Sequence, residues 1–218
     1  MRFDDILERQ KTLYTRKVVF YMKKIKSLFE RQFENHKVVA VLDKVTVGNE
    51  WVLAGEGKAT RKYDGTAVMI QNGDVYRRFD CKRGKTPPMG FIPCQEPDSI
   101  TRHWPGWVKI DKHNPIGDEK FFVEGYTNTF GDIDANVEDA TYELCGPKIN
   151  NNPERLDKHI LIKHGEDVLE IERNYESIKD FLKNNYIEGI VFHRGNGDMC
   201  KIKRVDFGFE WNGKTTKR

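Results

Sequence analysis

The chain has 218 residues, of which 38% are hydrophobic and 11% aromatic, and its formal net charge is +3. This composition excludes an intrinsically disordered chain and favours a globular protein with a substantial core. The longest strongly apolar run, VVFYM at 18–22, is far too short to span a bilayer. The start, MRFDDILERQ, lacks the apolar segment of a secretory signal. The sequence therefore predicts an intracellular protein that does not enter a membrane.

The four cysteines are widely separated along the chain: Cys81, Cys94, Cys145 and Cys200. The sequence has no CxxC pair, the usual start of a structural zinc site. The spacing does not indicate a disulfide framework either, so we expect reduced thiols and a cytoplasmic location.

Residues 5–34 are predicted to form a basic helix. Apolar residues recur there at steps of four and three and so share one helical face: Tyr14, Val18, Tyr21, Ile25 and Leu28. No acid interrupts the cations between Arg9 and Phe29; those nominated for RNA binding are Arg16, Lys17, Lys23, Lys24 and Lys26. Either the helix packs on the body and leaves a solvated cationic face, or this face contacts nucleic-acid phosphates. These residues alone leave both interpretations open.

Short strands are predicted from residue 37 onward. The run KVVAVLDKVTV at 37–47 is rich in β-branched residues, and Asn72-Gly73 separates two extended runs, as in a hairpin. Asp64-Gly65 also precedes an apolar run, which indicates another hairpin with Lys62 at its mouth. Most prolines fall within 84–118, so irregular structure with short extended pieces is expected there.

The remaining chain alternates predicted strands with one helix. The strands are FFVEGY at 121–126, TYELCG at 141–146, ILIKHG at 160–165, IEGIVFHR at 187–194 and MCKIKRV at 199–205. The helix has an apolar face formed by Tyr175, Ile178, Phe181 and Leu182. We therefore predict an α+β fold of mostly antiparallel sheets with flanking helices over residues 37–218, after a basic helical extension over residues 1–36.

Four stretches carry charged residues inside or beside apolar runs: KYDG at 62–65, YELCG at 142–146, IEGIVF at 187–192 and KIK at 201–203. Each is ordinary by itself. Glu143 can be a surface charge, and Lys201 and Lys203 can form the outward face of an edge strand. Taken together, the four stretches are harder to explain as solvated surface and indicate one shared site.

One chemistry uses all four stretches. A lysine amine attacks phosphorus only when neutral, so its pKa must fall from about 10.4. Lys201 and Lys203 share a strand face, where they are expected to lower the pKa of Lys62 and stabilise charge on an α-phosphate. Glu143 and Glu188 suit Mg²⁺, which prefers oxygen ligands. Lys62 would then carry a covalent phosphoramidate.

The neighbours of Lys62 fit this chemistry. Gly65 lets the backbone approach a nucleotide closely, and Asp64 suits the turn after the nucleophile. Arg61 adds a flanking cation for the nucleotide.

The motif order K-x-D-G, E-L-x-G, E-G-I-V and K-x-K resembles that of covalent nucleotidyltransferases, namely ATP-dependent DNA ligases, RNA ligases and mRNA capping enzymes. The segment YELCGPKINNNP is more similar to RNA ligases, and the nearest family is the 5′-3′ RNA ligases of animals, which has viral relatives. PGWV at 105–108 and CKIKRVDFGFEW at 200–211 also resemble segments of that family. The resemblance covers residues 37–211.

The resemblance implies a nucleotidyltransferase fold and a role for each matching residue. Lys62 would carry AMP, Glu143 would contact the ribose or a metal, and Glu188 would serve the metal. Lys201 would contact the α-phosphate, and Arg78 the nucleotide or the RNA 5′-phosphate. Lys203 matches the wider superfamily, although the animal enzymes favour histidine there.

The implied substrates are ATP with Mg²⁺ or Mn²⁺, and RNA with 5′-phosphate and 3′-hydroxyl ends. We expect a monomer in the cytoplasm, and the viral relatives leave a virus- or phage-encoded source open. Many ligases stack adenine on an aromatic residue where this chain has HILIKHG, so His159 and His164 either take part or are bonded within the structure. The short stretch after Lys203 is expected to hold no OB-fold, which favours RNA binding by the basic helix.

Two alternatives stay open from the sequence. A DNA ligase or a capping-type guanylyltransferase would use the same motifs on another substrate. A nucleic-acid-binding module on an inactive scaffold would keep the fold without the chemistry.

Overall fold

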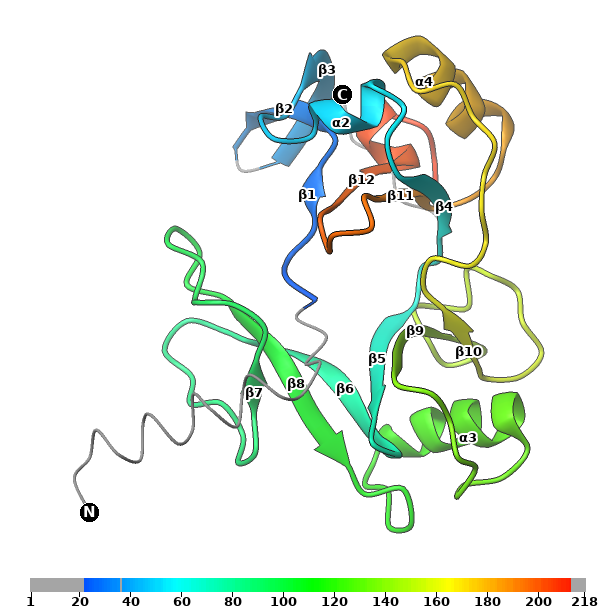
Figure 1. The fold of residues 1–218 in the computed structure, drawn as a ribbon. Coiled ribbons are helices and arrows are strands. Elements are labelled where there is room, and N and C mark those ends of the chain that lie inside the picture. Colours follow the sequence, from blue (N-terminus) through cyan, green and yellow to red (C-terminus); the bar gives the residue numbers. More distant parts are fainter. Residues whose placement is uncertain (1–21, 36, 213–218) are drawn as a thin grey trace.

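The computed structural model describes residues 22–35 and 37–212. Within this part of the chain, the strands form a four-stranded, a six-stranded and a two-stranded sheet. Figure 1 shows two lobes, with β4 leading downward from one and β5 continuing into the other. All strand pairs are antiparallel except β1 with β12. The predicted α+β class with mostly antiparallel sheets is confirmed.

The upper lobe contains the four-stranded sheet in the order β1-β12-β11-β4. Its strands are β1 (Lys26–Ser27), β12 (Met199–Lys203), β11 (Gly189–His193) and β4 (Lys58–Lys62). The same lobe holds the hairpin of β2 (Phe29–Glu34) and β3 (Lys37–Val45), the helices α2 (Glu50–Leu53) and α4 (Tyr175–Asn184), and the 3₁₀ turn η1 (Arg204–Phe207).

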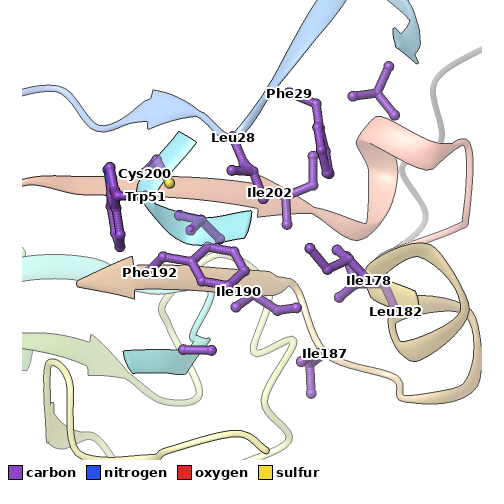
Figure 2. Packing of buried hydrophobic residues seen from close by; sticks show 13 residues of the cluster. Leu28, Phe29, Trp51, Ile178, Leu182, Ile187, Ile190, Phe192, Cys200 and Ile202 are labelled. Atoms are coloured by element: carbon purple, nitrogen blue, oxygen red, sulfur yellow. The ribbon is translucent and has the colours of Figure 1, made fainter. Parts of the chain in front are cut away.

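The core of this lobe joins segments far apart in the sequence (Figure 2). Leu28 and Phe29 come from the N-terminal segment, Ile190 and Phe192 from β11, and Leu182 from α4; all five are fully buried. Alternate residues of β11 and β12 point to this core, so the residues between them are left to face the other side of the sheet.

The lower lobe contains the six-stranded sheet in the order β10-β9-β5-β6-β8-β7. Its strands are β10 (Ile160–Lys163), β9 (Ala140–Cys145), β5 (Thr66–Gln71), β6 (Asp74–Cys81), β8 (Trp104–Ile110) and β7 (Ile92–Pro93). Helix α3 (Glu119–Phe130) packs against this sheet, where Phe122 and Tyr126 join Val68 and Leu144 in a second core.

Three local predictions are wrong, beginning with the N-terminal helix. Residues 26–34 form strands, and Leu28 N donates to the carbonyl of Lys201 at 2.7 Å. The burial of two consecutive residues, Leu28 and Phe29, in the upper core outweighs the helical spacing. The part of the predicted helix before residue 22 lies outside the described residues, as do Arg16 and Lys17.

FFVEGY is helical rather than extended. Its buried residues Phe122, Gly125 and Tyr126 follow helical spacing, which the high strand propensity of aromatic residues obscured. Around Lys62, β4 and β5 belong to different sheets, so the Asp64-Gly65 turn connects the two lobes instead of closing a hairpin. The hairpin at Asn72-Gly73 is confirmed, with positive φ at both residues.

Among the described residues, no helix has the length and apolar character needed to cross a bilayer.

Candidate active site

The turn after Lys62 is held by hydrogen bonds from distant parts of the chain. β4 ends at Lys62, and residues 63–65 carry the backbone to the other sheet. The Asp64 carboxylate accepts hydrogen bonds from Asn150 Nδ2 at 2.9 Å and from Trp211 Nε1 at 2.8 Å. Lys62 is therefore presented by a fixed turn between the lobes.

Gly65 fixes the other end of this turn. Its N–H donates to Glu143 Oε1 at 3.1 Å. A Cβ at this position would lie 2.2 Å from the carbonyl oxygen of Leu144 and 2.8 Å from Glu143 Cγ. Glycine is thus required for close contact between this turn and β9.

Glu188 lies between two of the predicted lysines. Its Oε2 accepts from Lys62 Nζ and its Oε1 from Lys203 Nζ, each at 2.5 Å, and its side chain is 5% exposed. Burial lowers the pKa of Lys62, but the attraction of Glu188 and then of Glu143 outweighs burial, so the pKa is raised. The prediction that neighbouring cations keep the Lys62 amine uncharged is therefore wrong for this arrangement.

Lys201 carries the lowered pKa instead. It faces the same side of β12 as Lys203, since buried and partly exposed residues alternate along this strand. Burial, followed by repulsion from Lys62 and Lys203, lowers the pKa of Lys201 to about 8. At neutral pH this lysine is still mostly charged and is suited to contact a phosphate.

The carboxylates nominated for a metal already have partners in the protein. Glu188 is shared by Lys62 and Lys203, and Glu143 Oε2 is bonded to His164 Nε2 at 2.9 Å. Within the described ranges, no group of three or more His, Cys, Asp or Glu side chains is arranged to hold a metal ion. The residues therefore do not fit a preformed Mg²⁺ or Mn²⁺ site.

A cavity of about 490 Å³ opens in front of Lys62 and is lined by both lobes. Six of the other nominated residues line it: Lys23, Lys24, Arg61, Arg78, Glu143 and Lys201. This volume is in the range of small-ligand sites. Glu188 and Lys203 are not among the lining residues, although Glu188 forms ion pairs with both Lys62 and Lys203.

The two arginines nominated for nucleotide binding occupy different surroundings. Arg61 Nη2 forms an ion pair with Glu154 Oε2 at 2.5 Å and lines the cavity. Arg78 Nη1 donates to the carbonyl of Met22 at 2.6 Å. No carboxylate of the described residues lies within ion-pair distance of Arg78, and burial lowers its pKa.

The described N-terminal cations lie between two cavities. Lys23 and Lys24 line the cavity at Lys62 and also, together with Lys26, a second cavity beside β2. Arg16 and Lys17 lie outside the described residues.

Several cavity residues escaped the sequence analysis, including Thr60 and His193. Thr60 Oγ1 lies 3.0 Å from His193 Nε2, and burial followed by repulsion from Lys58 lowers the pKa of His193 to about 4. Thr60 precedes Lys62 by two positions on one strand, so strand periodicity would have found it. His164 lines the cavity. His159 does not line it, and its Nδ1 lies 2.7 Å from Glu124 Oε2.

Comparison with known proteins points to RNA ligases. Residues 133–217 match the family model of RNA ligase 1. The RNA ligase 1 of Pongo abelii is 29% identical over 165 residues, which cover 58% of this chain and 50% of that protein. The Danio rerio protein of the same name is 28% identical over 138 residues, 50% of this chain and 42% of its own length. The Mus musculus protein is 28% identical over 166 residues, 58% of this chain and 50% of its own length.

The chain spans about half the length of the curated relatives it matches. The family match contains Glu143, Glu188, Lys201 and Lys203, whereas Lys62 lies before it. The resemblance stated from the motifs is thus confirmed: this chain is similar to the RNA ligase 1 family.

Proposed function

We propose that this protein is an ATP-dependent RNA ligase that carries AMP on Lys62 and joins RNA 5′-phosphate and 3′-hydroxyl ends. The observation that carries the proposal is the position of the Lys62 amine, at the wall of a cation-lined cavity and 2.5 Å from a buried carboxylate. The similarity to proteins named RNA ligase 1 supports RNA as the substrate.

In the first step, Lys62 Nζ bonds to the α-phosphorus of ATP, and the bond from this phosphorus to the bridging oxygen breaks to release pyrophosphate. The attacking nitrogen must lose its protons, and Glu188 Oε2 is the base nearest to it. Lys201 contributes positive charge to the reacting phosphate. Lys203 holds the other oxygen of Glu188 and so fixes this carboxylate.

In the later steps, an RNA 5′-phosphate oxygen displaces Lys62 from the adenylyl phosphorus, and an RNA 3′-hydroxyl then displaces AMP from the activated end. Such phosphoryl transfers depend mainly on positioning and charge stabilisation. ATP brings its own divalent cation, Mg²⁺ or Mn²⁺. Direct coordination by Glu188 would require it to exchange one of its lysine partners.

The mass of the intact protein tests the first step. After incubation with ATP and Mg²⁺, wild type should gain one AMP and Lys62→Ala should gain none. Lys109→Ala is the matched control, because Lys109 is an exposed lysine paired with Asp74 and lies outside the cavity. AMP uptake by Lys62→Ala would contradict the assignment of the nucleophile.

The choice of nucleotide and the choice between RNA and DNA separate the proposal from its alternatives. Labelled ATP should leave a stable adduct and labelled GTP should not, which distinguishes the ligase from a guanylyltransferase. The adenylated protein should then seal 5′-phosphorylated RNA in preference to DNA.

A further inference from the structure

The N-terminal residues Met22–Ile25, here called the strap, cross from one lobe to the other beside the cavity. On one side the chain continues into β1, which pairs with β12 next to Lys201. On the other side the Met22 carbonyl accepts from Arg78, and Lys24 N donates to Gln95 Oε1 at 2.8 Å. The strap thus forms a wall of the cavity and is attached to both lobes.

The cavity contains more positive charge than the protein compensates. Arg61 and Lys62 each have a buried carboxylate partner, Glu154 and Glu188. Four other lining cations have no carboxylate of the described residues within ion-pair distance: Lys23, Lys24, Arg78 and Lys201. Gathering such charges is unfavourable unless an anion shares the space. One α-phosphate does not require four cations, so a polyphosphate is the better match.

The strand order separates these cations in space. β4, which carries Lys62, and β1, which leads into the strap, are the opposite edges of the four-stranded sheet, with Lys201 on β12 between them. Three strand spacings correspond to about 14 Å. In phosphoryl transfer, the leaving oxygen lies roughly opposite the attacking atom. With the α-phosphate between Lys62 and Lys201, the position opposite the attacking amine is therefore on the side of the strap.

From this placement we infer that Lys23 and Lys24 of the strap, with Arg78, bind the β- and γ-phosphates of ATP and the pyrophosphate that leaves. The reaction in this inference rests on the proposed function. The polyphosphate site is argued separately, from the cations that line the cavity. Arg78 both holds the strap through the Met22 carbonyl and adds its own charge. RNA phosphates share this chemistry, so the test must separate the two sources.

The test compares Lys23→Ala/Lys24→Ala with Lys44→Ala/Lys109→Ala. The control removes the same charge from two exposed lysines that lie in surface ion pairs away from the cavity. Calorimetry with inorganic pyrophosphate and Mg²⁺ requires no catalysis. Loss of the strap lysines should weaken binding about tenfold, and the control should bind like wild type. Lys23→Arg/Lys24→Arg should retain binding, which excludes a folding defect as the cause.

Two reaction rates show whether the strap lysines bind pyrophosphate or RNA. In the strap variant, adenylate formation from ATP and its reversal by pyrophosphate should slow about tenfold, while transfer of preformed AMP to RNA should be unchanged. Slower transfer to RNA with normal pyrophosphate binding would assign the lysines to RNA and overturn the inference. Unchanged pyrophosphate binding and reversal would also overturn it. A wild type that binds pyrophosphate through these lysines without forming an adenylate would refute the proposed function alone.

Discussion

Among the neighbouring charges, the charge state of Lys62 depends most on Glu188, a carboxylate that sequence spacing could not position. The motifs predict that Lys62 shares a site with Lys201 and Lys203, and repulsion from Lys62 and Lys203 does lower the pKa of Lys201. They do not reveal that Glu188 lies between Lys62 and Lys203, bonded to both at 2.5 Å. The raised pKa keeps Lys62 as the ammonium, so the attack on ATP that we propose requires its deprotonation.

Replacing Glu188 with glutamine should make Lys62 more reactive toward acylating reagents but less competent in ligation. Glu188 raises the pKa of Lys62, so its removal lets burial and the nearby lysines lower that pKa and enlarges the neutral fraction near pH 7.5. Pulse acylation with peptide mass mapping should show modification of Lys62 about tenfold faster. The rise in reactivity with pH should move to lower pH.

Glu154→Gln is the matched control, because Glu154 is equally buried but pairs with Arg61. It should leave the acylation rate of Lys62 near that of wild type. Slower or unchanged acylation in Glu188→Gln would contradict the role assigned to this carboxylate.

At the scale of elements, the sequence predicted most strands near the site but not their sheets. The Asp-Gly turn is recognisable, yet its function as a connection between lobes depends on tertiary bonds from Asn150 and Trp211 to Asp64. Aromatic residues have a high strand propensity, so Phe122 and Tyr126 led to the wrong prediction of a strand. Their burial against β9 and β10 favours a helix instead. Local propensity identified the motif strands because their apolar alternation and their burial agree.

Gly65→Ala should destabilise the protein by about 1–3 kcal/mol and abolish adenylation. The added Cβ would overlap the Leu144 carbonyl at 2.2 Å, so the turn must move and the Glu143 hydrogen bond must break. Urea unfolding and intact mass after ATP treatment measure the two effects. Gly73→Ala is the control, because its Cβ would meet nothing within 4 Å and only its positive φ adds strain. Wild-type adenylation by Gly65→Ala would show that the turn tolerates displacement.

At the scale of the molecule, residues 26–34 are part of the upper lobe. The predicted division between residues 36 and 37 falls within the β2–β3 hairpin, and Leu28 and Phe29 are fully buried with residues of β11 and β12. For residues 1–21, which lie outside the described part of the chain, a separate N-terminal extension stays a prediction. Sequence could not show this incorporation, because the apolar residues of the segment also fit a helical face.

Leu28→Ala should lower the free energy of unfolding by about 2–5 kcal/mol, since it leaves a cavity in the upper core. Ile100→Ala, at a side chain that is 87% exposed, should change it by less than about 0.5 kcal/mol. Urea denaturation of both variants measures the difference. Equal stability of the two variants would mean that the N-terminal segment folds apart from the lobe.

The hydrogen bond between Trp211 and Asp64 joins residues that are 147 positions apart. Closing so long a loop costs chain entropy, and folds that depend on such non-local contacts form slowly. A chain still emerging from the ribosome therefore lacks this hydrogen bond on the turn after Lys62 until residue 211 has been synthesised.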